Sequence, residues 1–327
     1  MAGAGAIEAL VRVVLGLLLA ASLANGAAAE PITLTARPIL LDPGDPTRTT
    51  VGQLEFRGGV RMTSTDPRFG GLSDLSISAD GTRMLTISDH GAWVSARLEW
   101  DGGMLRGVST AELIPMLDAK GVPLAPPNAD AEAMITTPAG RIVTFERQHR
   151  LWLYPGEWPF AAPPQTLLAP QGLAKSPANG GLEAAVALSD GRLVLFAEQL
   201  KVAGGLAAWV QGTDGAFAPF TFVPVPGFEP SSAARLPDGD VLVLQRRFNL
   251  FDRTARIVRI AAAEFQPGAM LTGAEVATIN SPLNLDNMEG IAAIRASDGG
   301  VLVFLISDDN FNVLERTLLM VFRLGGP

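Results

Sequence analysis

The sequence contains no cysteine and only two histidines, and these absences exclude several kinds of site. Without cysteine the chain has no disulfide, no thiolate zinc site, no thiol nucleophile and no cysteine for lipid attachment. Two histidines are too few for a metal site with three histidine ligands. Acidic residues outnumber basic ones by 33 to 25, and the formal net charge of −8 is opposite to the basic surface of a nucleic-acid-binding protein. We therefore expect no nucleic acid among its partners.

Long apolar runs are also lacking. Residues 13–23 form an apolar run of 11 residues after Arg12, whereas a membrane-spanning helix needs about 20. The small residues 27–29 follow, which is the pattern of a secretory signal peptide. We predict a signal peptide over residues 1–29, cleaved after Ala29, and a periplasmic or secreted protein without a transmembrane segment in its mature chain. An N-terminal membrane anchor is the alternative interpretation.

Glycine and proline, at 35 and 24 residues, are abundant, and they punctuate a repeated pattern. Five segments consist of a short apolar strand, a turn and a second apolar strand. They are LSDLSISADGTRMLTISD (72–89), AEAMITTPAGRIVTFER (131–147), LEAAVALSDGRLVLFAE (182–198), PSSAARLPDGDVLVLQR (230–246) and MEGIAAIRASDGGVLVFLISD (288–308). Four of the turns are Asp-Gly, which predicts two-residue hairpin turns with positive φ at both residues.

The spacing of these hairpins predicts the fold. The turn glycines lie 59, 51, 48 and 60 residues apart, and a period of about 50 residues is typical of a β-propeller. We predict an all-β protein with one propeller domain over residues 50–327, preceded by an N-terminal extension over residues 30–49. Five units are clear, but the 298 residues left after cleavage (327 − 29) favour six blades. A strand around 51–56 is expected to close the ring against the last blade. A β-sandwich or two small β domains are the alternatives, and we expect a monomer.

The polar residues of the five segments gather at the open ends of the hairpins, whereas the middles are apolar. In a hairpin with a two-residue turn, residues equally far from the turn face one another. Counting from the turns pairs Glu183 with Glu198 and Glu289 with Asp308. If the hairpins radiate from one axis, all five open ends meet on one face of the ring.

Carboxylates that face one another repel, and they therefore favour a bound cation or a shared proton. A hard divalent ion such as Ca²⁺ takes about six to eight oxygen ligands and suits such a funnel. We predict a calcium site whose ligands are Glu132, Glu183, Glu198, Glu289 and Asp308. The candidates for proton transfer and anion binding beside them are Asp89, His90, Glu146, Arg147 and Arg246. Two alternatives stay open: the arginines neutralise the acids within the protein, or the set is a structural hydrogen-bonded ring.

Four stretches of the sequence resemble the phytase-like family, whose members are often labelled esterase-like activity of phytase family proteins. They are GGLSDLSISADGTRMLTISDHGAW (70–93), DAEAMITTPAGRIVTFERQHRLWLY (130–154), NGGLEAAVALSDGRLVLFAEQ (179–199) and NMEGIAAIRASDGGVLVFLISDDNF (287–311). The likeness extends over residues 50–324. It implies a secreted bacterial β-propeller related to calcium-dependent propeller phytases, which hydrolyse phosphomonoesters in a carboxylate funnel with Ca²⁺ and basic residues.

The resemblance also implies roles for individual residues. The acids that match the family's motifs by position are Asp89, Glu132, Glu183 and Glu289, and strand-end basic or polar positions correspond to Arg147 and Arg246. The glycine that follows the motif glutamate is kept only as Gly290, because Ala133 and Ala184 stand at the other two positions. The chain has three lysines, so a polyanionic substrate such as phytate would depend on arginine.

Other catalytic chemistry has less support. The sequence has no GxSxG motif, which excludes the nucleophile elbow of an α/β-hydrolase. Ser88, Asp89 and His90 offer a serine-esterase alternative, but alternate residues of a strand share a face, so Asp89 points away from the other two. We predict a calcium-assisted phosphoester or ester hydrolase that acts on a small anionic substrate in the central funnel. A non-catalytic propeller of the cell envelope that binds a ligand or a protein is the alternative.

Overall fold

The protein is described by a computed structural model that covers residues 29–248 and 253–325. The predicted signal peptide, apart from Ala29, lies outside these described residues. Within them, the regular structure consists of 24 β-strands and two short 3-10 helices, η1 (Leu173–Lys175) and η2 (Ala262–Glu264). Neither helix has the length or the apolar character that a bilayer crossing requires.

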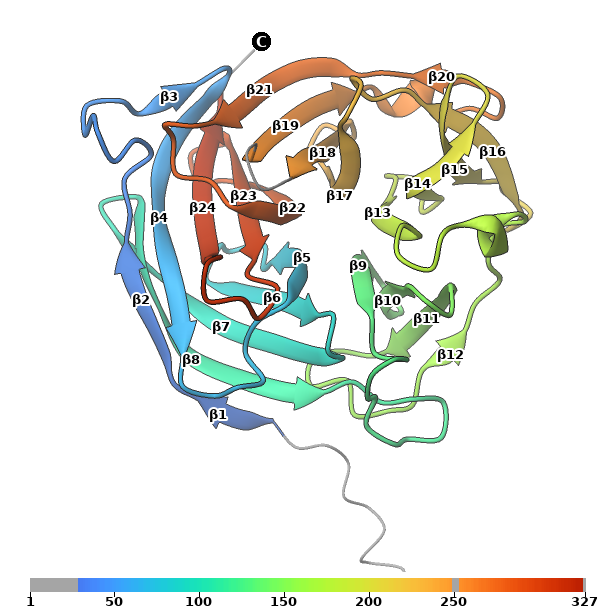
Figure 1. Ribbon diagram of the computed structural model, residues 1–327, viewed down its shortest axis with the longest axis horizontal. Helices are drawn as coiled ribbons and strands as arrows, with labels where there is room; N and C mark the ends of the chain where they lie inside the picture. Colours follow the sequence, from blue (N-terminus) through green and yellow to red (C-terminus); the bar gives the residue numbers. More distant parts are fainter. Residues whose placement is uncertain (1–28, 249–252, 326–327) are drawn as a thin grey trace, which may run out of the picture.

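The strands form five blades around one axis, with β5, β9, β13, β17 and β22 innermost (Figure 1). The first blade is β5 (Leu72–Ile77), β6 (Arg83–Ser88), β7 (Ala92–Asp101) and β8 (Met104–Pro115). The second is β9 (Ala131–Thr137), β10 (Gly140–Phe145), β11 (Arg150–Pro155) and β12 (Gln165–Thr166). The third is β13 (Leu182–Ala187), β14 (Leu193–Val202), β15 (Gly205–Gln211) and β16 (Phe217–Phe222), with β20 (Met270–Leu271) on its outer edge.

The fourth blade is β17 (Glu229–Arg235), β18 (Val241–Phe248), β19 (Arg253–Ile260) and β21 (Ala274–Asn280). The fifth is β22 (Asn287–Arg295), β23 (Val301–Asp308), β24 (Thr317–Leu324) and β4 (Leu54–Ser64). Each inner strand packs against the next, and β22 returns to β5, so the ring is closed. Apolar clusters fill the space between neighbouring blades; one of them joins Leu242 and Ile257 of the fourth blade to Ile291 and Leu305 of the fifth.

The prediction of an all-β propeller is confirmed. The described residues provide five inner strands that contact one another in a ring, and no sixth inner strand is found among them. The length estimate treated every residue as part of a unit of equal size. The first blade instead uses long strands, with 10 residues in β7 and 12 in β8. Residues 30–64 form no separate blade, because they provide β4 and three short edge strands.

Ring closure by the N-terminal strand is confirmed. Strand β4 is the fourth strand of the fifth blade and pairs antiparallel with β24, with Phe56 opposite Phe322 and Leu54 opposite Leu324. The preceding extension adds β1 (Glu30–Ile32) to β8, whereas β2 (Leu34–Pro38) and β3 (Thr50–Val51) both pair with β4. The first and last parts of the chain are thereby held in one sheet, which leaves no gap between the first and last blades.

The Asp-Gly turns differ from the prediction in their geometry. In the third blade the Leu188 N–H donates to the Arg192 carbonyl and the Gly191 N–H donates to the Leu188 carbonyl, which encloses a loop of three residues. Gly191 alone has positive φ, at 86°, and Asp190 Oδ1 instead accepts the Arg192 N–H at 3.1 Å. The loops at Gly239 and Gly299 have the same pattern. The extra loop residue shifts the strand register by one from the predicted one.

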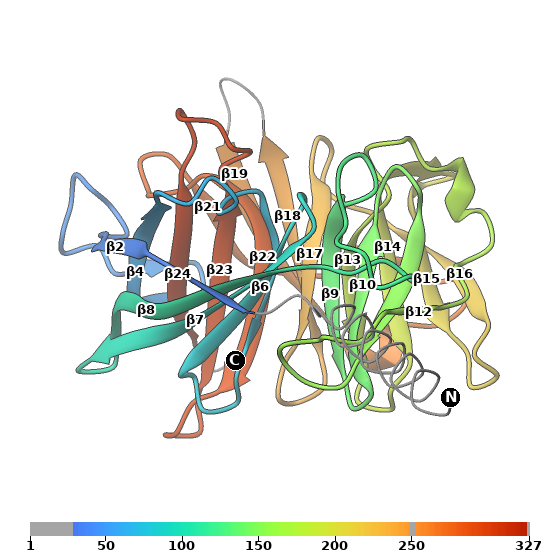
Figure 2. The ribbon, with the colours of Figure 1, turned by 90° about the horizontal axis from the view of Figure 1, so that it is seen from below.

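A β-bulge interrupts each inner strand close to the open end of its hairpin. The register skips one residue at Ser73, Glu183, Ser231 and Glu289, and skips Glu132 together with Ala133. A bulge leaves the extra residue out of the ladder and redirects its side chain. The inner strands run from one face of the ring to the other (Figure 2), so the five bulges lie near one face and the hairpin turns near the opposite face.

Candidate functional site

Two positions of each blade supply a group of polar side chains at the open ends of the inner hairpins. The first position is the bulged residue of the inner strand. The second lies on the neighbouring strand, directly after the partner of the residue that precedes the bulge; for example, Glu198 follows Ala197, which pairs with Leu182. We call these ten residues the acidic mouth: Ser73, Asp89, Glu132, Glu146, Glu183, Glu198, Ser231, Arg246, Glu289 and Asp308. Seven of them are carboxylates, so repeated blade geometry brings acids that are distant in the sequence to one place.

Arg246 links three blades across this mouth. Its Nη2 donates to Glu183 Oε2 at 3.2 Å and to Glu198 Oε1 at 2.9 Å, and its Nη1 donates to Asn287 Oδ1 at 2.8 Å. Nη1 also forms an ion pair with Glu289, and its guanidinium is largely buried, with 18% of the side chain exposed. One cation therefore serves three carboxylates, and burial, followed by the charge of Glu198, raises the pKa of Glu183 well above its usual value.

These contacts revise the predicted pairing. Glu198 donates its N–H to the Gly181 carbonyl, and Asp308 pairs with Asn287, so neither acid lies directly across the hairpin from its predicted partner. The cause is the three-residue turn together with the bulge. Glu183, Glu198 and Glu289 still converge, but on Arg246, which is the internal neutralisation left open as an alternative.

A second group of acids lies beside the first. Asp130, Glu132 and Glu146 each place one carboxylate oxygen within 4.8 Å of the others. Glu146 Oε1 accepts the Gly180 N–H at 2.6 Å and also the Gly181 N–H. Burial raises the pKa of Glu146 to about 7 in spite of these two donors. Burial and the charges of Glu183 and Glu146 raise the pKa of Glu132 well above its usual value.

The donor set of this second group fits a hard divalent cation. It offers three carboxylates and no nitrogen or sulfur ligand, which is the chemistry that Ca²⁺ prefers. Arg147 pairs with this group: its Nε donates to Asp130, and its side chain is 48% exposed. An exposed ion pair leaves most of the negative charge of the buried carboxylates uncompensated. The group therefore favours either a bound cation or protons retained on Glu132 and Glu146.

Asp89 and Asp308 are the carboxylates that the first and fifth blades contribute at the ends of their second strands. Burial, followed by the charge of Asp130, raises the pKa of Asp89 to about 7. Burial also raises the pKa of Asp308 to about 7, although its Oδ1 accepts the Asn310 N–H at 2.7 Å. Asp89 reaches its place because residue 71 is glycine: a Cβ there would lie 2.0 Å from Asp89 Oδ1.

His90 is placed for packing more than for proton transfer with Ser88. Its ring stacks on Phe311, with centroids 4.0 Å apart and planes 11° from parallel. Ser88 is buried; its Oγ donates to the Gly70 carbonyl at 2.8 Å and accepts the backbone N–H of His90. The Ser88 hydroxyl also lies 3.4 Å from Asp89 Oδ1, so the expectation that Asp89 points away from Ser88 is wrong. The His90 ring packs on Phe311 and makes no contact with the Ser88 hydroxyl among the hydrogen bonds of the described residues, so the serine–histidine pair of a serine esterase is not formed.

A cavity of about 550 Å³ adjoins the acidic mouth next to Arg246. The residues that border it include Glu198, Glu229, Arg247, Asn287 and Asn310. Below the mouth, Asp74 closes the centre of the ring. Its Oδ2 accepts the Met134 N–H at 2.7 Å, and its Oδ1 accepts the Ser232 hydroxyl at 2.7 Å.

Asp74 and Ser232 therefore form a floor, and the Ile291 N–H adds a third blade by donating to Ser232 Oγ at 3.1 Å. Burial of Asp74 outweighs the hydrogen bonds it accepts and raises its pKa to about 7.

The sequence missed two residues of this site. Asp130 completes the three-carboxylate group, and Asn287 donates to Glu289 Oε1 at 2.7 Å while it accepts from Arg246. Both stand two positions before a bulged glutamate, in DAE and NME. Because residues two apart in a strand share a face, that spacing was the available signal.

A search of curated proteins finds no match to this sequence. Among solved structures, a gluconolactonase from Xanthomonas campestris is 12% identical, covers 91% of this chain and 96% of its own, and has a TM-score of 0.41. A luciferin-regenerating enzyme is 10% identical and covers 79% of this chain and 95% of its own, with a TM-score of 0.40. A hypothetical protein from Leishmania major is 11% identical and covers 86% of this chain and 91% of its own, with a TM-score of 0.42.

The family comparison covers most of the propeller. The model of the phytase-like family, described as "Esterase-like activity of phytase", matches residues 67–311. This range spans 245 of the 327 residues (311 − 67 + 1) and includes every residue of the acidic mouth. The chain belongs to the phytase-like family.

Proposed function

We propose that the protein is a calcium-assisted hydrolase of a small phosphoester or carboxylic ester, with its active site in the acidic mouth. The observation that supports this function is the group formed by Asp130, Glu132 and Glu146, whose oxygens approach within 4.8 Å of one another. It lies inside the range matched by a family described by esterase-like activity. The non-catalytic binding alternative does not require three acids, one of them buried, at this distance.

In this proposal Asp130, Glu132 and Glu146 hold the calcium ion. A bound divalent cation supplies a Lewis acid that polarises a carbonyl or phosphoryl oxygen. Glu183, Glu198 and Glu289 are positioning residues here instead of ligands, because Arg246 already pairs with all three. The predicted role of Arg246 changes accordingly from substrate binding to holding these acids in place.

Two side chains are suited to act on the substrate directly. Asp89 has a pKa of about 7, which matches the requirement for a general base that gains and loses a proton near neutral pH. Arg147 is the exposed cation beside the carboxylate group, and its planar guanidinium suits one anionic group of the substrate. Seven of the ten residues of the acidic mouth are carboxylates, which favours a substrate with one anionic group over a polyanion such as phytate.

Paired assays of the purified protein test this function. We expect hydrolysis of a chromogenic phosphomonoester or of a chromogenic carboxylic ester in the presence of Ca²⁺, and loss of that activity in EDTA. Glu132→Gln should lower the activity by about 100-fold or more, because it removes one of three charged ligands. The matched control is Asp101→Asn, which neutralises an exposed carboxylate in the β7–β8 turn.

The outcome of these assays is decisive in either direction. Activity that is equal with calcium and with EDTA, or equal in Glu132→Gln and wild type, would exclude the proposed site. Whichever chromogenic substrate is hydrolysed identifies the bond. No hydrolysis of either compound, together with calcium binding that Glu132→Gln abolishes, would favour the non-catalytic alternative.

We also propose that the chain is exported after removal of its signal peptide. Strand β1 begins at Glu30, so cleavage after Ala29 leaves every strand of the described residues intact. Sequencing the N-terminus of the protein from the periplasm or medium should give Glu-Pro-Ile; an uncleaved Met1 would contradict the proposal. The monomeric state stays a prediction that sedimentation would test.

A further inference from the structure

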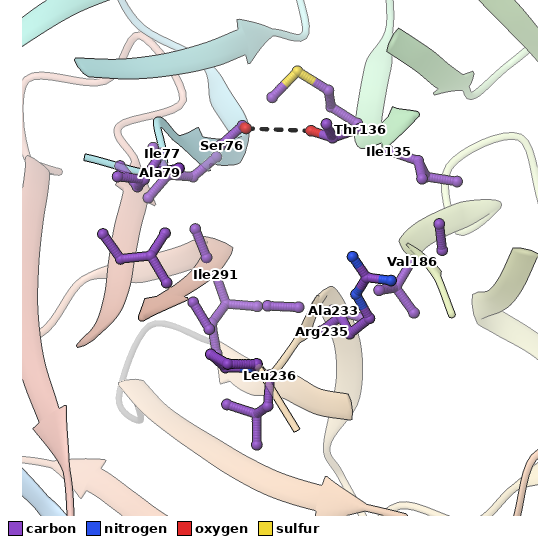
Figure 3. A pocket seen from close by; sticks show the side chains of 18 of the residues that line it. Ser76, Ile77, Ala79, Ile135, Thr136, Val186, Ala233, Arg235, Leu236 and Ile291 are labelled. Carbon is purple, nitrogen blue, oxygen red and sulfur yellow. Dashed lines mark hydrogen bonds between the residues drawn. The ribbon is translucent and has the colours of Figure 1, made fainter. Parts of the chain in front are cut away.

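A second cavity lies at the other end of the ring, where the inner hairpins turn (Figure 3). It has a volume of about 550 Å³, and all five inner strands line it. The floor formed by Asp74 and Ser232 separates it from the acidic mouth, since Leu75 and Met134, whose N–H groups bind Asp74, border this cavity. Nothing in the proposed hydrolytic function uses this space.

The walls of this cavity are mainly apolar. The larger apolar side chains that line it are Leu75, Ile77, Met134, Ile135, Val186, Leu236, Ile291 and Ile294. Ser76 and Thr136 are hydrogen-bonded to each other at 3.3 Å, as the dashed line in Figure 3 shows, so their hydroxyls have partners. Among the described residues, no aspartate or glutamate lines the cavity, which contrasts with the acidic mouth and with the net charge of −8. An apolar wall of this size suits a ligand with an apolar body.

Three arginines are the charged groups of the lining: Arg141, Arg235 and Arg295. Within residues 29–248 and 253–325, none of them forms an ion pair, whereas twelve other arginines do. Arg295 Nη1 donates to the Gly299 carbonyl at 3.3 Å. Arg235 extends from β17 into the ring of apolar side chains in Figure 3.

Of these three arginines, Arg141 has the greatest need of an anionic partner. Its Nε is buried and has no hydrogen-bond partner, and its Nη1 reaches the Gly140 carbonyl at 3.5 Å, the outer limit of a hydrogen bond. Burial lowers the pKa of this guanidinium, and the charge of Glu157 acts against that effect. Its Cζ lies 5.8 Å from the centre of the Phe160 ring, a contact that supplies no negative charge. A partly buried guanidinium without a carboxylate is costly, and an anionic ligand would compensate for that cost.

We propose that this cavity is a second binding site, for a small organic monocarboxylate with an apolar body. The apolar walls would cover the body of the ligand, and Arg141 and Arg235 would bind its carboxylate, for which the planar guanidinium is suited. A single charge is favoured over a phosphate dianion because removing two charges from water into an apolar cavity costs more. The absence of acids from the lining means that nothing there repels the head group.

Calorimetric titration with three probes tests the site. Octanoate has both a charge and an apolar body, octanamide has the body without the charge, and acetate has the charge without the body. We expect octanoate to bind at least about tenfold more tightly than either of the other two. Arg141→Gln and Arg235→Gln should each weaken octanoate binding by about tenfold and leave octanamide unchanged.

Matched variants make the result unambiguous. Arg61→Gln removes the same charge from an exposed position on β4, outside the cavity lining, and should leave octanoate binding unchanged. Glu132→Gln should also leave it unchanged, so failure of the hydrolytic site and failure of this site are distinguishable. Octanoate that binds no better than octanamide, or that is weakened equally by Arg61→Gln and Arg141→Gln, would overturn the proposal.

Discussion

Arg246 stands where the other blades of the acidic mouth carry a carboxylate, and it pairs with Glu183, Glu198 and Glu289. Buried carboxylates that lose their cation retain the full cost of leaving water. We expect Arg246→Gln to lower the free energy of unfolding by about 3–5 kcal/mol, measured by urea denaturation near neutral pH.

Arg147→Gln is the matched control for that measurement. It removes an arginine whose side chain is 48% exposed and which pairs with Asp130, so its cost should be about 0–1 kcal/mol. Lowering the pH should reduce the effect of Arg246→Gln, because protonated glutamates no longer need the guanidinium. A loss of stability that is equal in the two variants would show that Arg246 does not hold the acids as described.

At the scale of elements, Gly290 shows how one bulge depends on its surroundings. It follows the bulged Glu289, as Ala133 and Ala184 follow the bulged Glu132 and Glu183. A Cβ on residue 290 would lie 2.6 Å from Ile306 Cγ2 and 3.0–3.1 Å from the backbone of Asp74. The fifth blade therefore approaches the first too closely for alanine.

Gly290→Ala should consequently destabilise the protein, by about 1–3 kcal/mol in urea denaturation, as other overpacked core positions do. The reverse change at the equivalent position, Ala184→Gly, creates no clash and should cost only about 0.5–1 kcal/mol. If Gly290→Ala is as stable as wild type, the close approach of β22 and β5 at this point is wrong.

The turns and bulges also show which features of the strands could be predicted from the sequence and which could not. Strand pairs and their spacing follow from local apolar patterns and from Asp-Gly, which the sequence displays directly. The loop length at Asp190-Gly191 and the bulge at Glu183 depend on how neighbouring blades pack, and no residue type signals them. The contacts of these residues consequently differ from the predicted ones: Glu183 and Glu198 meet through Arg246, which belongs to another blade.

At the scale of the whole molecule, the two ends of the ring differ in charge. The acidic mouth holds seven carboxylates, and the cavity at the turns has arginines and no acid. Blade number belongs to this scale as well, because it is set by how many residues the long strands β7, β8 and β4 use. The number of residues in each strand is a property of the closed ring, so the spacing of the repeats alone could not predict the number of blades.

The charge of the acidic mouth couples calcium, pH and stability. Buried carboxyls whose pKa lies above the usual value are Asp74, Asp89, Glu132, Glu146, Glu183 and Asp308. Without a cation, the folded protein keeps protons on these groups that the unfolded chain releases near pH 4. The stability that they contribute is therefore complete below that pH and is lost as the pH rises through about 7.

Calcium should reverse this trend, because it binds the ionised forms. We expect the difference in Tm between calcium and EDTA to be small near about pH 5 and to grow towards about pH 8. At about 100 times its dissociation constant, the ion contributes about 2.7 kcal/mol, which corresponds to a rise in Tm of roughly 5 °C or more. Glu132→Gln should flatten this dependence on pH, whereas Asp101→Asn should preserve it. A calcium effect that is the same at both pH values would mean that the ion binds elsewhere, since only ligands that must lose protons make its affinity rise with pH.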